Sequence, residues 1–277
     1  MPGLFGRQVY LEIGPRAGGR ARVVRDLRIA FRVVQTSSSG PYEATIDVFN
    51  PAPETVAAAR NTSNQIRLLA GYDTVGTVFV GHALRGGVRV VHRGPDRVMT
   101  IDAQDGWRAL ADAKISKTYT TRTTAQEVVD EVVAQAGLPR GIIRIPGTFT
   151  FENGVVLHGS ARRILDELTE TINGRWAIVD GALELHDTDE PTVLGQRGPH
   201  VSVAAGNLIG SPTVRTDEAG VANYEVRSLL LPSMRPWRPF RLTAEDLRGD
   251  LVARDVVHQG DSGWDSAFYT DIVARQR

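Results

Sequence analysis

The chain has 277 residues, of which 42% are hydrophobic and 23% charged, so it is long enough for two or three domains and has the composition of a folded protein. Its 32 basic and 32 acidic residues give a formal net charge of zero, which argues against a protein that holds nucleic acid or an anionic membrane by charge. The absence of cysteine excludes disulfides, cysteine-ligated zinc and thiol catalysis. No run is apolar over the length of a signal-peptide core or a membrane-spanning helix, so we expect neither.

The first hundred residues predict antiparallel β-strands. Apolar and polar or small side chains alternate over residues 27–33 and 42–48, and further strand patterns follow between residues 66 and 104. A short helix is predicted near 53–60, where a proline precedes a run of alanines and Asn61 ends it. Residues 1–104 are therefore predicted to form a first β-domain, a barrel or a sandwich, with one short helix.

The pattern changes to helical spacing after about residue 105. Apolar side chains recur at helical positions over residues 124–136. Thr124 and Glu127 have the spacing of a capping box, and Gly137 suits the left-handed residue that ends a helix. These features predict a helix over this segment.

A second helix is predicted over residues 161–173, with Ser160 as its N-cap. After it, Asp180–Gly181 can take the two positive φ values of a tight hairpin turn. Residues 105–192 are therefore predicted to form a small α+β domain.

Strand patterns separated by proline and glycine return from Gly195 onward, so residues 193–277 are predicted to form a second β-domain. The predicted fold class is mainly β with an α+β insert, in which two antiparallel β-domains flank a small helix-containing domain.

The segment Gly260-Asp261-Ser262-Gly263 has the letters of the nucleophile loop of chymotrypsin-like proteases. Such a nucleophile needs a histidine base, an orienting aspartate and donors for the oxyanion. Only fifteen residues follow Ser262, Trp264 stands where the protease motif has its second glycine, and His258 is very close in sequence. We therefore predict a polar hairpin turn here and no catalytic serine.

No other motif predicts a chemical site. The acidic run at 186–191 lacks the glycine and distal glutamate of an EF-hand and is predicted to be a solvated loop. The glycine-rich run at 14–22 lacks the Lys-Ser/Thr of a phosphate-binding loop, and the tripeptide at 248–250 is predicted to be a β-turn. We predict no catalytic, cofactor-binding or metal-binding residue, and an assembly protein that is not an enzyme.

The tryptophans and histidines are scattered along the sequence, which supports this prediction. Tryptophans are expected to act as core or interface anchors, and they stand at Trp107, Trp176, Trp237 and Trp264. None of the histidines has the spacing of a metal-binding pair, and they stand at His82, His92, His158, His186, His200 and His258.

The C-terminal segments carry a recognisable order of motifs. Residues 208–212 read L-I-G-S-P, residues 256–261 read V-V-H-Q-G-D and residues 268–272 read F-Y-T-D-I. This order resembles the end of phage baseplate hub proteins, the family that includes the gp27-like hub of T4 and tail protein D of P2. In that family glycine is usual where Trp237 stands, and tryptophan is usual where Phe268 stands.

The resemblance extends over nearly the whole chain. Residues 44–58 and 66–83 resemble the first tube-like domain of the family, and residues 123–138 and 158–185 resemble its helix-bearing insert. The resemblance implies two tube-type β-barrel domains and a homotrimer, in which these domains alternate around a ring of pseudo-sixfold symmetry. The hairpin that closes the chain is expected to complete a sheet between copies.

By the same resemblance, the ring would join a hexameric tail tube to a trimeric spike and let DNA pass. The implied partners are further copies of the chain, tail-tube or tube-initiator proteins, the spike or puncturing protein and the tape-measure protein. DNA would be transient cargo, for which zero net charge is suitable, and no cofactor or stable membrane insertion is implied. The implied location is the baseplate of the virion tail, after assembly in the bacterial host cytoplasm.

Two alternatives stay open. A tail-tube or distal tail ring protein would be hexameric, and a hub with peptidoglycan-hydrolase activity would be an enzyme, for which Ser262 and Glu170 are the residues to test.

Overall fold

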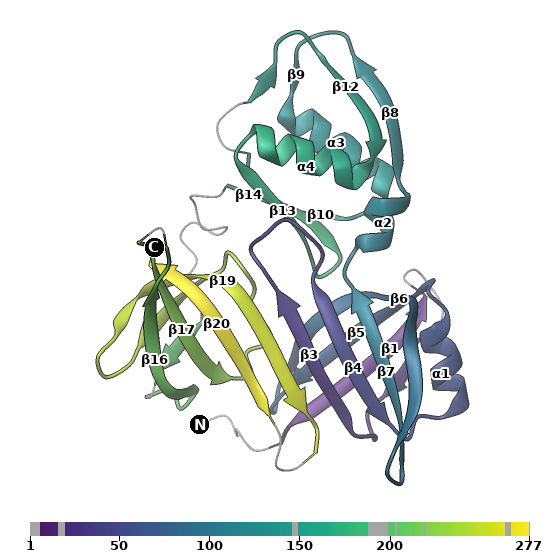
Figure 1. Cartoon of the computed structure of the whole chain (residues 1–277), viewed down its shortest axis with the longest axis vertical. Helices are drawn as coiled ribbons and strands as arrows, with labels where there is room; N and C mark the ends of the chain where they lie inside the picture. Colours follow the sequence, from purple (N-terminus) through teal and green to yellow (C-terminus); the bar gives the residue numbers. More distant parts are fainter. Residues whose placement is uncertain are drawn as a thin grey trace.

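The computed structural model of the chain describes residues 6–15, 20–145, 149–187, 199–202, 204–218, 220–263 and 267–276. The structure is mainly β with a small helical part, as predicted. Figure 1 shows a broad layer of strands below and a smaller α/β part above it. No helix in the described part of the chain has the length and apolarity needed to cross a membrane.

The helices are α1 (Pro53–Arg60), α2 (Trp107–Asp112), α3 (Ala125–Ala136) and α4 (Ala161–Thr171). The strands of the first β-region are β1 (Gln8–Pro15), β2 (Arg22–Val24), β3 (Ile29–Gln35), β4 (Glu43–Phe49), β5 (Asn64–Gly71), β6 (Val75–Arg93) and β7 (Asp96–Gln104). Those of the middle part are β8 (Lys114–Tyr119), β9 (Thr123–Thr124), β10 (Arg140–Ile143), β11 (Thr150–Phe151), β12 (Val155–Ser160), β13 (Gly174–Val179) and β14 (Ala182–Asp187). Those of the last β-region are β15 (His200–Ser202), β16 (Leu208–Thr216), β17 (Ala222–Leu229), β18 (Pro239–Thr243), β19 (Arg248–Asp261) and β20 (Phe268–Gln276).

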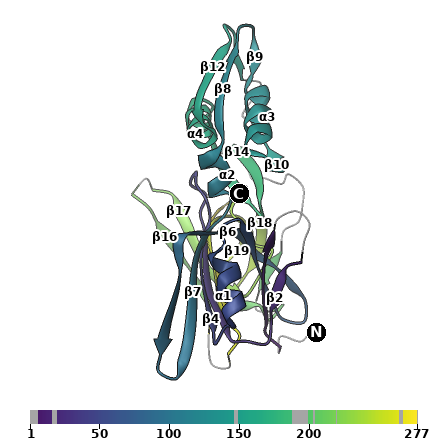
Figure 2. The same ribbon diagram turned by 90° about the vertical axis from the view of Figure 1, so that its right-hand side faces the viewer.

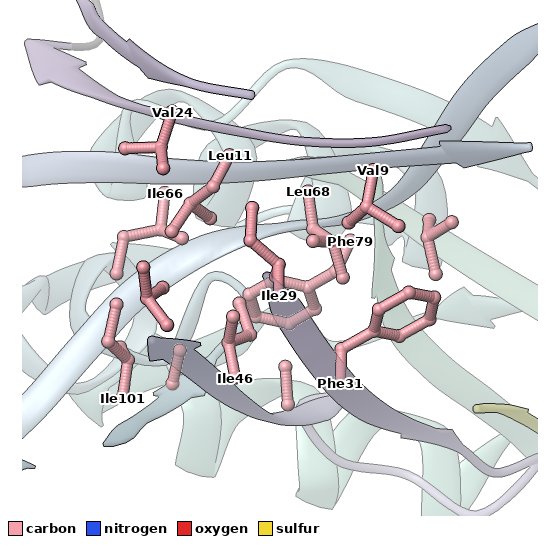
Figure 3. Packing of buried hydrophobic residues seen from close by; sticks show 14 of the residues in the cluster. Val9, Leu11, Val24, Ile29, Phe31, Ile46, Ile66, Leu68, Phe79 and Ile101 are labelled. Carbon is pink, nitrogen blue, oxygen red and sulfur yellow. The ribbon is translucent and has the colours of Figure 1, made fainter. Parts of the chain in front are cut away.

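The first β-region curls around one core. Its strands follow the order β3-β4-β7-β6-β5-β1-β2, and alternate side chains of each strand point inward because the side chains of a strand alternate between its two faces. Figure 3 shows Leu11, Ile29, Ile46, Ile66 and Ile101 meeting from five different strands. The predicted alternation is thus the reason this region has a core.

Strand β6 is long and bends in its middle. Residues 75–82 pair with β5, whereas residues 88–93 pair only with β7 within the described chain, and the register shifts between Ala83 and Val88. Gly87 lies at this bulge, where a Cβ atom would come within 2.7 Å of the Asp102 carbonyl oxygen. The bend carries the β6–β7 hairpin beyond the rest of the sheet (Figure 2).

The last β-region has a second core. Strands β16, β17, β20 and β19 follow one another in the sheet, and β18 and β15 extend from β19. Val226, Phe240, Leu251, Val256 and Ile272 are buried together here.

The two β-regions share one continuous sheet, which the sequence did not predict. Strand β19 pairs antiparallel with β3, from Val256 opposite Gln35 to Asp261 opposite Ala30. Its other edge pairs with β20, which also pairs with β17. The expectation that this terminal hairpin completes a sheet between copies is therefore wrong, because both of its strands are interior and join the two regions of one chain.

The middle part has its own hydrophobic cluster, formed by α2, α3, α4 and the strands around them. The predicted capping box is present, since the Thr124 hydroxyl accepts from the Glu127 N–H and the Glu127 carboxylate accepts from the Thr124 N–H. Gly137 follows with a φ of 60°. Helix α4 ends at Thr171, two residues before the predicted end, and α2 was not predicted.

The predicted hairpin of the middle part joins β13 to β14. Asp180 and Gly181 take the positive φ values of 51° and 85°. The predicted domain limit between residues 192 and 193 lies outside the described residues, and the division at 104 and 192 stays a prediction.

Candidate functional site

The Gly-Asp-Ser-Gly segment closes β19: Gly260 and Asp261 are its last two residues, and Ser262 and Gly263 follow the strand. Asp261 binds the Arg28 guanidinium through both carboxylate oxygens, at 2.8 and 3.1 Å. The Ser262 Oγ accepts the Ile29 N–H at 2.9 Å, and the Ser262 N–H donates to the Ile29 carbonyl at 3.0 Å. These contacts hold the start of β3 against the end of β19. Trp264 lies outside the described residues.

His258 does not act as a base for Ser262. It is fully buried, its Nδ1 lies 3.0 Å from the Thr270 hydroxyl and its Nε2 lies 3.2 Å from the Met234 carbonyl oxygen. Burial, with Arg235 nearby, lowers the pKa of His258 to about 3. The imidazole is therefore neutral at pH 7, and both of its nitrogens face groups other than the serine.

Two predicted turns or loops are strands in the structure. Residues 248–250 begin β19 and pair with β18, and Asp250 accepts from Arg241 at 2.9 Å, so the predicted β-turn is wrong. In the acidic run, His186 is fully buried in β14, so the prediction of a solvated loop is wrong there. Residues 188–191 lie outside the described residues. Within the described chain, no group of His, Asp and Glu could hold a metal ion.

A buried polar cluster lies where the three parts of the chain meet. Arg235 follows the last residues of β17 and is 4% exposed. Its Nη2 donates to the Thr77 carbonyl in β6 at 2.7 Å and to Asp180 of the middle part at 2.8 Å, and its Nη1 donates to the Met234 carbonyl at 2.8 Å. One side chain therefore holds the β13–β14 turn against both β-regions.

Trp237 packs into the same junction. It stacks on His186 with ring centroids 4.1 Å apart, and it shares a buried cluster with Tyr42, Ala177 and Val179. Its φ of 59° lies in the left-handed region that favours glycine. Glycine would adopt this backbone conformation without strain, whereas the position here holds a tryptophan that is 2% exposed.

The junction shifts the pKa values of its buried ionisable side chains in different directions. Glu184 accepts from Arg238 at 2.9 Å and lies 3.0 Å from Nε2 of His186. Burial would raise the pKa of Glu184, but His186 and Arg238 lower it below its usual value. Burial lowers the pKa of His186, whereas burial and the neighbouring Asp180 raise the pKa of Asp105 well above its usual value.

The sheet has one polar face that crosses both β-regions. Since the cores take the alternate side chains, the remaining ones form aligned rows from β17 to β6. Several positive side chains of this face form ion pairs with negative side chains of the same face. The pairs are Arg227 with Asp271 at 2.6 Å, Arg89 with Asp102 at 2.8 Å and Arg93 with Asp47 at 3.0 Å.

Neither a protein-family model nor a curated protein sequence matches the chain. Solved structures do match it. The tail protein from Neisseria meningitidis MC58 and the 43 kDa tail protein of prophage MuSo2 from Shewanella oneidensis each give a TM-score of 0.67 at 9% identity, over 98% of this chain and 97% of theirs. An E. coli component of the type VI secretion system, similar in structure to the T4 tail proteins gp27 and gp5, gives 0.63 at 13% identity, over 96% of this chain and 76% of that one.

These likenesses establish the fold. The chain has the fold of phage tail proteins and of a gp27-like component of type VI secretion, which is the fold that the sequence resemblance implied.

Proposed function

We propose that the chain is a structural baseplate hub protein of a phage or phage-like tail. The shared fold supports a structural role in a tail, and the contacts of Ser262 and His258 give no support to hydrolysis at the serine. The observation that carries the proposal is the seam between β19 and β3, which places two β-regions side by side in one sheet.

That seam supports a ring of threefold symmetry with pseudo-sixfold appearance. Each copy contributes two adjacent β-regions in a single antiparallel sheet, so three copies would present six such regions in sequence around an axis. A ring of this kind would match six tube subunits on one side and three spike subunits on the other. The proposed partners are therefore tail-tube or tube-initiator proteins, a spike protein and the tape-measure protein.

The polar face of the sheet is the surface we assign to the lumen. Arg89, Arg93 and Arg227 are paired with carboxylates of the same face, which reduces the unpaired positive charge that a DNA molecule would meet. Unpaired Lys and Arg side chains bind phosphates and release counterions, which would hold DNA in the channel. A charge-balanced face suits a conduit through which DNA slides.

The test is the mass of the purified protein in solution together with its co-purified neighbours. We expect a trimer that binds tail-tube and spike proteins expressed from the same tail. A stable monomer that binds neither would contradict the proposal. A hexamer would instead indicate a tail-tube or distal tail ring protein.

A further inference from the structure

The middle part has a core of its own and meets the β-regions through a small junction (Figure 1). Its hydrophobic cluster is formed entirely by residues between 109 and 185. The hydrophobic side chains that pack across the junction form a separate small cluster of Tyr42, Ala177, Val179 and Trp237. The chain enters the middle part at Asp105 and Gly106, which connect β7 to α2. The middle part can therefore keep its own core when the junction contacts are lost.

Two features of the junction favour separation of its two surfaces. Trp237 has a left-handed φ of 59°, which costs free energy in a residue that carries a side chain. Five buried polar atoms at the junction have no hydrogen-bond partner among the described residues, namely Tyr42 Oη, Asp105 Oδ1, Arg235 Nε, Trp237 Nε1 and Arg238 Nη1. Such atoms give up hydrogen bonds to water without replacing them. Separation would return these atoms to water and let the Trp237 backbone relax.

The β13–β14 turn is held from two sides. Arg235 donates to Asp180, the first residue of the turn, at 2.8 Å. Asp105 accepts from the N–H of Gly181, the second residue, and its own N–H donates to the Tyr42 carbonyl at 3.0 Å. Because Arg235 already neutralises Asp180, a negative charge on Asp105 would be buried without an opposite charge of its own. A protonated Asp105 keeps the hydrogen bond to the turn and avoids this cost.

The other ionisable groups of the junction do not supply that missing charge. Glu184 accepts from Arg238 at 2.9 Å and lies 3.0 Å from Nε2 of His186. Burial raises the pKa of Tyr42 well above its usual value, so the phenol stays neutral. Burial, with Arg238 and Arg144 nearby, lowers the pKa of His186. Since an exposed His186 would bind a proton more readily than the buried one, this residue favours separation as pH falls.

We propose that the middle part detaches from the β-regions as a folded unit, and that the proton on Asp105 controls this separation. The device is independent of the proposed ring, because it lies within one copy. Burial and Asp180 raise the pKa of Asp105 well above its usual value while the junction is closed. Once exposed, the carboxyl releases its proton above about pH 4. Through Asp105, separation becomes more favourable as pH rises, until the carboxyl ionises in the closed junction as well.

Thiol labelling tests this proposal directly, because the chain has no cysteine of its own. Ala177→Cys places one thiol in the junction cluster, where Ala177 is fully buried. Ala161→Cys and Ala70→Cys are matched controls, since these alanines are fully buried in the cores of the middle part and of the first β-region. The labelling rate in buffer, divided by the rate in concentrated urea at the same pH, measures how often each thiol is exposed. Each variant is compared with and without Asp105→Asn.

The Ala177→Cys thiol is expected to be exposed more often than either control thiol. Its exposure with Asp105, divided by its exposure with Asp105→Asn, is expected to rise by up to about tenfold for each pH unit between pH 5 and 7, because each opening releases one proton. The effect of His186 cancels in this ratio, since both proteins carry that residue.

Equal exposure of all three thiols would show that the junction opens only when the protein unfolds, and would overturn the separation. A ratio that stays constant with pH would overturn the control by the Asp105 proton. Either result would leave the proposed hub standing, because neither concerns contacts between copies.

Discussion

Arg235 is the residue that touches all three parts of the chain. Replacing it with methionine keeps an apolar stem in place but leaves the Thr77 and Met234 carbonyls and Asp180 without this donor. We expect Arg235→Met to lower the free energy of unfolding by about 2–3 kcal/mol, since hydrogen bonds to a charged group are among the stronger ones. Urea denaturation measures this change.

Arg241→Met is the matched control, because it removes an exposed pair with Asp250. Its expected cost is below about 1 kcal/mol. Equal losses in the two variants would show that Arg235 does not hold the junction.

Asp105 gives the junction a dependence on pH. Its folded pKa is raised by burial and by Asp180, so the folded state binds a proton that the unfolded chain releases above about pH 4. The contribution of Asp105 to the free energy of unfolding is fully present below that pH and is lost as pH rises toward the folded pKa. We expect Asp105→Asn, which stays neutral and can still accept the Gly181 N–H, to gain stability over the parent as pH rises from 4 to 8. Denaturation midpoints that shift in parallel for both proteins over this range would rule out a neutral Asp105.

Substitution of Ser262 distinguishes a structural role of the protein from an enzymatic one. The Ser262 Oγ accepts the Ile29 N–H at 2.9 Å, so Ser262→Ala is expected to cost about 1 kcal/mol of stability through one lost hydrogen bond. Neither the parent nor this variant is expected to clear peptidoglycan in a zymogram. Clearing by the parent that is lost in Ser262→Ala or Glu170→Ala would identify a hydrolase.

Among the elements, β19 carries the seam between the two β-regions. A Cβ atom at Gly260 would lie 2.4 Å from Phe31 of β3 and 2.9 Å from Phe268 of β20. We expect Gly260→Ala to destabilise the protein by about 1–3 kcal/mol, because the rings on both sides must shift. Gly249→Ala in the same strand meets no atom within 4 Å and is the control for strand propensity. Thermal unfolding of the two variants compares them, and an equal effect would contradict tight packing at the seam.

The local elements could be predicted because their signals lie within a few residues of one another. The capping box of Thr124 and Glu127 and the turn at Asp180–Gly181 are of this kind. The pairing of β19 with β3 could not be predicted, since more than two hundred residues separate Asp261 from Ala30. An alternating pattern predicts a strand but does not indicate which other strand it pairs with. The burial of His186 could not be predicted either, because it stacks on Trp237, which is distant in sequence. The acidic residues next to His186 in the sequence suggested a solvated loop instead.

For the whole molecule, the structure places two β-regions in one sheet, whose described strand path begins at β16 and ends at β2. Three copies around one axis would therefore present six such regions. We therefore expect an assembly with threefold symmetry in which six β-regions surround the axis. An end-on averaged image of purified particles is the decisive measurement: we expect three identical copies that show six similar lobes around one channel. Six identical copies, or single particles with no channel, would contradict it.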